Sequence, residues 1–188
     1  MKVIVEPKVE PVSLAEVKAQ IGIQSSDTAS DALITRRIVE ARKWAEGYTG
    51  RALILQTRES RWDCFVDEHE CPSALSVVSV KYIDTDGAEQ TLDAANYVLD
   101  TYQFIPHVRK AYGVSWPSTR SERNAVRIQY TAGYGPLSTS VEPLIREAII
   151  LLVGHWMNFQ PAAESGISMS RIPYAVRDLL DPYRLYFV

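Results

Sequence analysis

The hydrophobic period of this chain changes twice, and this change constrains the fold more than any other feature. Within residues 34–48, apolar side chains recur at spacings of four and three residues, which is one face of a helix. In residues 78–82 and again in 126–131, apolar and polar residues alternate, which is typical of half-buried strands. Helical spacing returns after residue 143. The order helix, strand, helix indicates an α+β fold.

Two helices are predicted before the first strand. The first begins at a capping box, Ser13-Leu-Ala-Glu16, in which the hydroxyl and the carboxylate bind amides that a helix start leaves unpaired. The second begins near Ser30 or Asp31 and ends at Gly50. These signals place helical structure over residues 1–51.

Residues 52–134 are predicted to form the β-rich part of the chain. Beside the two alternating segments, residues 97–99 and 104–108 are weaker strand candidates. The sequence Asp84-Thr-Asp-Gly87 predicts a turn, because glycine readily takes a positive φ. A small antiparallel sheet is the simplest arrangement of such segments.

The predicted fold is α+β: a helical bundle with an inserted small antiparallel β-sheet. The bundle would consist of two N-terminal helices, one long apolar helix that begins near Pro143, and a short C-terminal helix. We expect a single domain over residues 1–188. Its helical parts are 1–51 and 135–188, and an aperiodic, mobile loop at about 158–171 interrupts the second part.

The charge of the chain argues against a protein that coats nucleic acid. It has 20 Lys and Arg against 23 Asp and Glu, for a net charge of −3. The charges are unevenly spread: residues 51–100 hold ten acidic and four basic side chains, and residues 101–150 hold six basic and three acidic ones. Opposite poles of this kind could meet in head-to-tail self-association, or the carboxylates could simply lie in solvated hairpins.

Nothing in the sequence indicates a membrane segment or a disulfide framework. The most apolar stretch, residues 148–153, is six residues long, whereas a membrane span needs about 20. The two cysteines are Cys64 and Cys71. Two cysteines in 188 residues favour a reduced compartment, so we expect a soluble protein that is made and kept inside a cell.

The sequence predicts neither a metal site, nor a cofactor, nor an enzyme. Cys64, His69 and Cys71 lie close together, but the spacing of a zinc site is absent. A small hydrolase around His107 or His155 is the weakest candidate, because no nucleophile, base and orienting group can be assigned.

A nucleic-acid-binding module is the alternative function, and it would use residues 97–134. That stretch interleaves aromatic side chains with arginine and lysine, which could bind nucleic acid by stacking and charge. The same residue types are enriched in subunit interfaces and strand cores, and we favour that interpretation because no RNA-recognition motif is present.

The order of the signals resembles the phage head–tail connector family, also called adaptor or head-completion proteins. The resemblance begins at Glu10-Pro-Val-Ser-Leu-Ala-Glu-Val-Lys18 and continues through Ala41-Arg-Lys-Trp-Ala-Glu-Gly-Tyr-Thr-Gly-Arg-Ala52. It is also carried by Leu55–Thr57, Ser76–Asp84, Trp116-Pro117, Val126–Tyr134 and the closing Ile172–Arg184. One departure is Glu70-Cys-Pro-Ser-Ala-Leu75, which stands where the family usually has an apolar segment and a proline.

The resemblance implies a structural virion protein that is not an enzyme. Such proteins form a ring of about a dozen copies on the portal, although the single chain can be a monomer in solution. The ring extends the DNA channel without sequence-specific DNA binding and offers a surface to the tail or a stopper protein. The location implied is the head–tail interface of a virion, with the host cytoplasm during assembly, whether the source is a free phage or a prophage.

The C-terminal segment is the predicted docking site for a partner. It follows an aperiodic stretch and resembles an arm that becomes ordered on binding. The residues expected to dock are Ile172, Pro173, Tyr174, Val176, Leu179, Leu180, Tyr183 and Arg184.

Overall fold

The chain divides into two compact units, each built from two separate stretches of sequence. The computed structural model describes residues 1–158 and 172–186. The β unit is Met1–Lys8 with Leu55–Pro136, and the helical unit is Val9–Ile54 with Leu137–Val188. The single domain expected over residues 1–188 stays a prediction, and each unit is described by itself.

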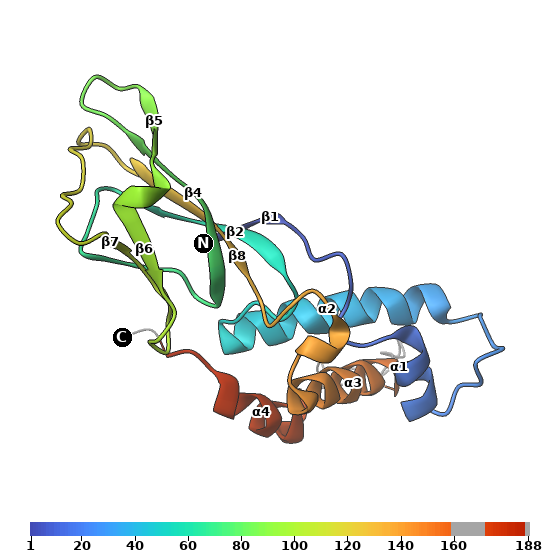
Figure 1. Cartoon of the computed structure of the whole chain (residues 1–188). Helices are drawn as coiled ribbons and strands as arrows, with labels where there is room; N and C mark the ends of the chain where they lie inside the picture. The colour runs from blue at the N-terminus through green and yellow to red at the C-terminus, as the bar shows by residue number, and fades with distance from the viewer. Residues whose placement is uncertain (159–171, 187–188) are drawn as a thin grey trace, which may run out of the picture. The chain divides into compact units, whose positions relative to one another are not determined.

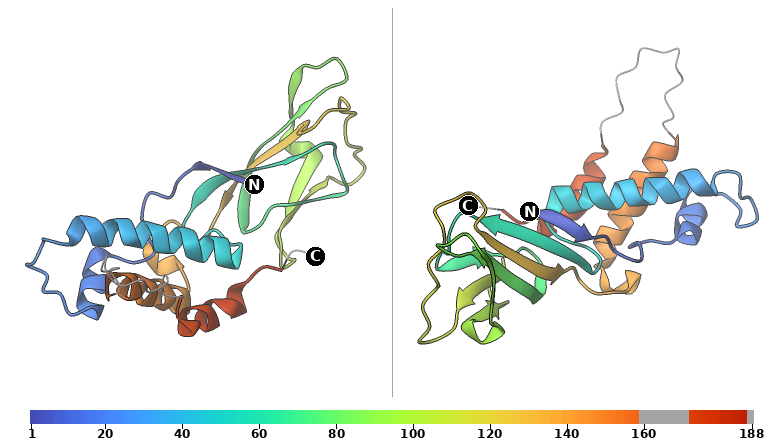
Figure 2. Two further views of the ribbon diagram at one scale, coloured as in Figure 1. Left: turned by 180° about the vertical axis from the view of Figure 1, so that it is seen from behind. Right: turned by 90° about the horizontal axis from the view of Figure 1, so that it is seen from above.

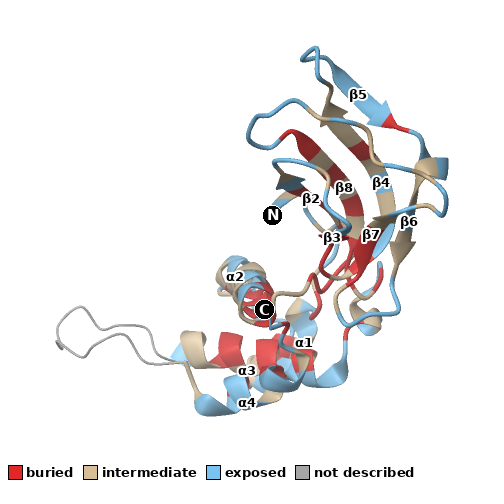
Figure 3. Cartoon of the chain, turned by 90° about the vertical axis from the view of Figure 1, so that its left-hand side faces the viewer, coloured by how far each residue is buried: buried red, intermediate tan, exposed pale blue. Residues whose placement is uncertain are grey.

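Five antiparallel strands form the larger sheet of the β unit, in the order β1–β2–β8–β4–β5 (Figure 1). They are β1 (Lys2–Val5), β2 (Gln56–Trp62), β4 (Ala74–Ile83), β5 (Glu89–Leu92) and β8 (Val126–Ala132). The central strand β8 buries every second residue, so that Val126, Ile128 and Tyr130 are fully buried (Figure 3). The alternation predicted for residues 126–131 is confirmed.

A second, three-stranded antiparallel sheet has the order β3–β7–β6 (Figure 3). Figure 2 shows the strands of the β unit from two further sides. Its strands are β3 (Glu68–Glu70), β6 (Tyr97–Asp100) and β7 (His107–Lys110). An aromatic cluster joins the two sheets. Phe65 stacks on Trp116 with ring centroids 4.6 Å apart, and His69 of β3 meets Trp62 of β2 at 4.7 Å. Because His69 lies inside this cluster, it is buried.

Strand β4 departs from the alternation that the sequence predicts. Its pairing with β8 shifts between Ala74 and Ser76 and again between Val77 and Ser79. Each shift inserts one extra residue, and a bulge of this kind redirects side chains. Val78 was expected on the buried face, but it is 53% exposed, while Val80 two residues later is fully buried.

The described residues of the helical unit form four α-helices, together with short 3-10 turns. They are α1 (Leu14–Gln20), α2 (Asp31–Thr49), α3 (Pro143–Asn158) and α4 (Tyr174–Leu180). The predicted capping box is confirmed: the Glu16 amide donates to Ser13 Oγ at 3.2 Å, and the Ser13 amide donates to Glu16 Oε2 at 2.8 Å. Gly50 ends α2 in the left-handed region, with φ of 72°, as predicted.

The prediction of a helical bundle with a small inserted sheet is wrong. The described residues form eight strands in two sheets, and β1 comes from the N-terminus, not from the predicted insertion. The long apolar helix is also absent, because α3 is amphipathic. It buries Ile145, Ala148, Ile149 and Leu152, but Leu144 is 47% exposed. Short edge strands show little alternation, which is why the sequence understated the β content.

Two further findings concern the chain beyond its core. The predicted loop at about 158–171 lies outside the described residues, except for Asn158, which is the last residue of α3. Within the described ranges, no helix is both long and apolar enough to cross a membrane.

Candidate partner-docking site

The residues predicted to dock a partner differ in how accessible they are. Val176 and Leu180 are buried, Ile172, Pro173, Leu179 and Tyr183 are half-buried, and Tyr174 and Arg184 are exposed. The two buried side chains are four residues apart on α4 and therefore share one helix face, while most of the other side chains are exposed. This is the pattern of a helix packed against its own unit. They cannot touch a partner while the unit is folded, and the most accessible candidates are Tyr174 and Arg184.

Residues 181–186, which we call the C-terminal strap, are bound to the end of α2. Tyr48 Oη donates to Asp181 Oδ1 at 2.6 Å, and Arg51 Nε donates to the Tyr183 carbonyl, also at 2.6 Å. The Leu185 amide donates to the Thr49 carbonyl at 2.7 Å, and the Leu185 side chain is only 4% exposed. The strap is therefore held both by polar contacts and by one buried apolar side chain.

An aromatic patch surrounds Arg184 where the strap meets α2. The Arg184 guanidinium lies 5.2 Å from the ring centre of Tyr48 and 5.3 Å from that of Tyr186. Tyr48 also stacks on Trp44, with centroids 5.1 Å apart. The hydrogen bond to Asp181 raises the pKa of Tyr48, because the carboxylate stabilises the protonated phenol. Tyrosine, tryptophan and arginine are the side chains most enriched at binding hot spots.

The sequence did not identify the aromatic patch as one site. Trp44 and Tyr48 belong to a helix more than a hundred residues before the strap, and Tyr48 was assigned to the apolar helix face. Tyr186 lies beyond the segment that carried the resemblance. A spacing of four residues between Trp44 and Tyr48 does predict that the two rings share a helix face.

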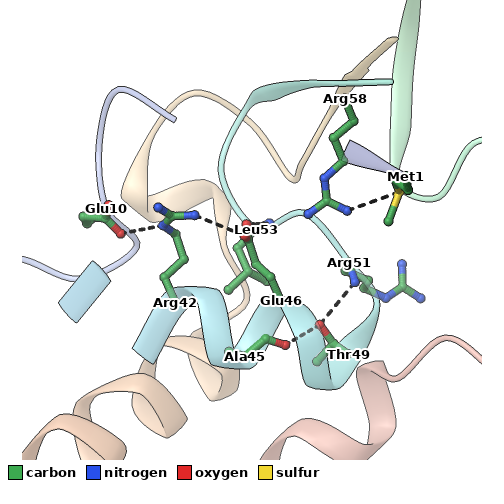
Figure 4. Close-up of polar contacts among 9 residues, drawn as sticks. All are labelled: Met1, Glu10, Arg42, Ala45, Glu46, Thr49, Arg51, Leu53 and Arg58. Atoms are coloured by element: carbon green, nitrogen blue, oxygen red, sulfur yellow. Dashed lines mark hydrogen bonds and ion pairs between the residues drawn. The ribbon is translucent and has the colours of Figure 1, made fainter. Parts of the chain in front are cut away.

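The end of α2 is fixed by polar contacts within the helical unit (Figure 4). Arg42 Nε donates to Glu10 Oε2 at 2.8 Å, and Arg42 Nη1 donates to Glu46 Oε2 at 3.1 Å. Thr49 Oγ1 donates to the Ala45 carbonyl at 2.8 Å and accepts from the Arg51 amide at 3.3 Å. The helix that carries the aromatic patch is thus a rigid platform.

Several aromatic and basic residues of 97–134 are not available for contacts with nucleic acid. Tyr130 is fully buried, and Trp116 stacks inside the aromatic cluster of the two sheets. The guanidinium of Arg109 is bound to carboxylates, 3.0 Å from Glu68 and 3.3 Å from Asp100. Stacking platforms for bases need exposed rings beside free cations, so these residues do not favour the nucleic-acid alternative.

The acidic and basic segments meet within one chain. Lys110 pairs with Asp67 at 3.5 Å, Arg109 pairs with Glu68, and Arg127 pairs with Glu89. These ion pairs within one chain engage several of the charged side chains that the sequence suggested for contacts between subunits. Exposed pairs of this kind contribute little to stability, on the order of 0–1 kcal/mol each.

The described residues offer no cluster of metal-ligating side chains. Among them, no three His, Cys, Asp or Glu side chains gather as a metal site. Cys64 is exposed and Cys71 is buried, and burial raises the pKa of Cys71 to about 12. A thiol with a raised pKa is a poor nucleophile. His107 is nearly buried in β7, and His155 is half-buried in α3.

Comparison with known protein families gives a match over the first half of the chain. Residues 11–99 match the model of the phage gp6-like head-tail connector protein family. The chain carries a head–tail connector region. The resemblance drawn from the sequence is therefore confirmed, and the matched residues include α1, α2 and strands of the β unit. None of the curated proteins matches the chain.

Solved structures are similar in fold to the chain over its whole length. A chain from the neck of an empty gene transfer agent (GTA) particle, computed with C6 symmetry, superposes with a TM-score of 0.79 at 21% identity, covering 100% of this chain and 97% of that one. A chain of the native GTA virion gives 0.74 at 21%, covering 98% and 97%. The neck of the native particle, computed with C12 symmetry, gives 0.71 at 21%, covering 100% and 97%. At this identity the likeness establishes the fold.

Proposed function

We propose that this connector protein is a structural component of the neck of a phage-like particle, with no catalytic role. The match of residues 11–99 to the head-tail connector family is the observation that carries the proposal. A fold shared over the full length with chains from GTA necks supports it. The protein would act at the head–tail interface of the virion and pass through the host cytoplasm during assembly.

The assembled form we propose is a closed ring of about a dozen copies on the portal protein. The related neck structures were computed with C6 and C12 symmetry, which is compatible with such a ring. The ring would continue the DNA channel and present a surface to a tail or stopper protein. A net charge of −3 suits a channel wall, because strong phosphate binding would hinder the passage of DNA.

Native mass spectrometry and negative-stain microscopy with the portal protein from the same gene cluster test this function. We expect rings that stay attached to the portal and are absent when the portal is omitted at low concentration. If the protein stays a monomer at high concentration and never binds the portal, the proposed function is wrong.

Within this function, we propose that the aromatic patch and Tyr174 contact the portal or the tail-side partner. Their exposure and composition support the proposal: Tyr174 is 74% exposed and Tyr186 is 63% exposed. Truncation is a poor test, because Val176 and Leu180 belong to the core of the helical unit.

Surface substitutions avoid this problem. Arg184→Glu and Tyr174→Ala should weaken binding to the partner about tenfold or more without lowering the melting temperature appreciably. Tyr112→Ala, which removes a fully exposed ring of the β unit, is the matched control and should leave this binding unchanged. Equal binding by all three variants would show that the docking surface lies elsewhere.

A further inference from the structure

Two exposed sets of charges of opposite sign lie on different units. Glu142 and Glu147 are exposed at the start of α3, and their carboxylates form no ion pair or hydrogen bond with any described residue. Arg123 is exposed in the loop between β7 and β8, and it also lacks such a partner among the described residues. In the same loop, the exposed Arg120 has an ion pair only with Glu122, which is also exposed, at 3.6 Å.

The first set forms what we call the acidic face of α3: Glu142, Leu144 and Glu147. Leu144 and Glu147 are three residues apart and share one face of the helix, and Glu142 directly precedes the first helical residue. Leu144 is 47% exposed, so an apolar side chain stands between two unpaired carboxylates. An apolar side chain with a charged rim is typical of an interaction surface.

The second set, Arg120 and Arg123, forms what we call the basic loop. The loop is fixed on both sides of these residues, because the Arg120 amide donates to the Ile83 carbonyl at 3.1 Å and the Asn124 amide donates to Asp63 Oδ1 at 2.8 Å. The guanidinium of Arg120 packs directly over Gly87, where a Cβ would collide with it. Groups held in place in the free protein lose little entropy on binding.

We propose that the acidic face of α3 in one copy receives the basic loop of a second copy of this chain. The inference rests on the proposed ring. A ring with cyclic symmetry needs a heterologous interface, in which each subunit presents two different and complementary surfaces. The acidic face and the basic loop are such a pair, with complementary charge on separate units.

We infer a second copy of the chain as the partner because other basic side chains of the β unit already form ion pairs within one chain. Lys110 and Lys81, two other basic side chains of the β unit, are engaged with Asp67 and Glu89 within the same chain. Arg123 has no such carboxylate partner among the described residues, and Arg120 has only Glu122 of its own loop, at 3.6 Å. Because Glu142 and Glu147 have no cation on theirs, contact between two copies neutralises both sets at once.

Charge reversal and its rescue test the contact. Arg120→Glu with Arg123→Glu, and separately Glu142→Lys with Glu147→Lys, should each weaken ring formation about tenfold or more, as measured by sedimentation and native mass spectrometry. The chain that carries all four reversals restores the attraction, so it should form rings again. Raising the salt concentration should weaken the wild-type ring, since contacts between exposed charges are screened.

Two matched controls reverse charges elsewhere: Arg36→Glu on α2, whose side chain is 64% exposed, and Glu70→Lys on β3. Both should assemble as the wild type does. Circular dichroism and the melting temperature show whether each variant folds, and the rescue by four reversals separates a lost contact from a lost fold.

The remaining outcomes overturn the inference. Normal rings from both reversed variants, or four reversals that fail to rescue, would mean that the two surfaces do not meet, while the proposed function would stand. Loss of portal binding with self-association intact would assign the acidic face to the portal. If the wild type forms no ring with or without the portal, both this inference and the proposed function fail.

Discussion

Nη1 of Arg42 lies 3.1 Å from Oε2 of Glu46, and both side chains are buried, at 2% and 8% exposed. The other carboxylate oxygen of Glu46 accepts from the Leu53 amide at 3.0 Å. Arg42 also binds Glu10, which precedes α1. One buried ion pair on α2 therefore holds two other segments of the helical unit, the one before α1 and the one after Gly50 (Figure 4).

Arg42→Ala should strongly destabilise the protein, because it leaves the Glu46 carboxylate buried without its cation. Removing one partner of a buried pair costs about 3–5 kcal/mol. The free energy of unfolding, measured by urea titration with circular dichroism, checks the prediction.

An exposed pair on the same helix provides the control. Arg36 lies 3.6 Å from Glu40 and is 64% exposed, so Arg36→Ala should cost less than about 1 kcal/mol. Replacing both buried partners, Arg42→Met with Glu46→Gln, should be milder than Arg42→Ala alone, since the buried carboxylate is removed together with its cation. Glu10 loses Arg42 in both variants, but its side chain is 24% exposed. Equal losses from Arg42→Ala and Arg36→Ala would contradict the buried-pair account.

Two glycines of α2 should respond to the same substitution with opposite signs. Gly50 has a φ of 72°, which strains any residue with a Cβ, so Gly50→Ala should destabilise the protein by about 1 kcal/mol. Gly47 lies within the helix with open space around it, so Gly47→Ala should stabilise by about 0.5–1 kcal/mol. Thermal unfolding of the two variants gives the comparison, and shifts of the same sign would refute it.

The C-terminal strap should open when its buried side chain is shortened. Leu185→Ala removes most of an apolar side chain that is only 4% exposed, which typically costs about 2–5 kcal/mol. The strap is short, so we expect local release, seen as faster tryptic cleavage after Arg184. Tyr186→Ala, next to it but 63% exposed, should leave cleavage unchanged. Wild-type cleavage rates in Leu185→Ala would show that the polar contacts alone hold the strap.

Sequence reasoning succeeded where a local interaction determines the structure. The capping box of Ser13 and Glu16 and the left-handed Gly50 depend on neighbours within a few residues, and both are present as predicted. The turn at Gly87 has the positive φ that its sequence implied. The resemblance to connector proteins was also correct, because it rested on the order of such local motifs.

The errors concern structure that depends on distant partners. β1 pairs with β2, more than 50 residues away, and its four residues alone carry no reliable strand pattern. β2 is Gln56–Trp62, a polar sequence that becomes a strand because β1 and β8 lie on both sides of it. The aromatic patch likewise joins α2 to the strap, and no spacing in the sequence predicts that contact.

The buried histidine of the β unit should make the protein sensitive to acid. Burial lowers the pKa of His69 to about 4, because the charged imidazole would be desolvated among Trp62, Phe65 and Trp116. In the unfolded chain its pKa is about 6.5. Above pH 6.5 both states are neutral and His69 adds no pH dependence. Between pH 6.5 and 4 only the unfolded chain binds the proton, so stability falls as the pH falls.

The loss due to His69 should reach up to about 3 kcal/mol at pH 4, because each pKa unit corresponds to about 1.4 kcal/mol. His69→Phe cannot titrate and suits the aromatic surroundings, so its unfolding free energy should change less between pH 7 and 4. The variant also loses the hydrogen bond that His69 Nε2 accepts from the Val66 amide. The test therefore compares how steeply the unfolding free energy changes with pH, and not its value at a single pH. His155→Gln, outside the cluster, should keep the wild-type slope. Identical slopes for His69→Phe and the wild type would mean that His69 is not buried as a neutral ring.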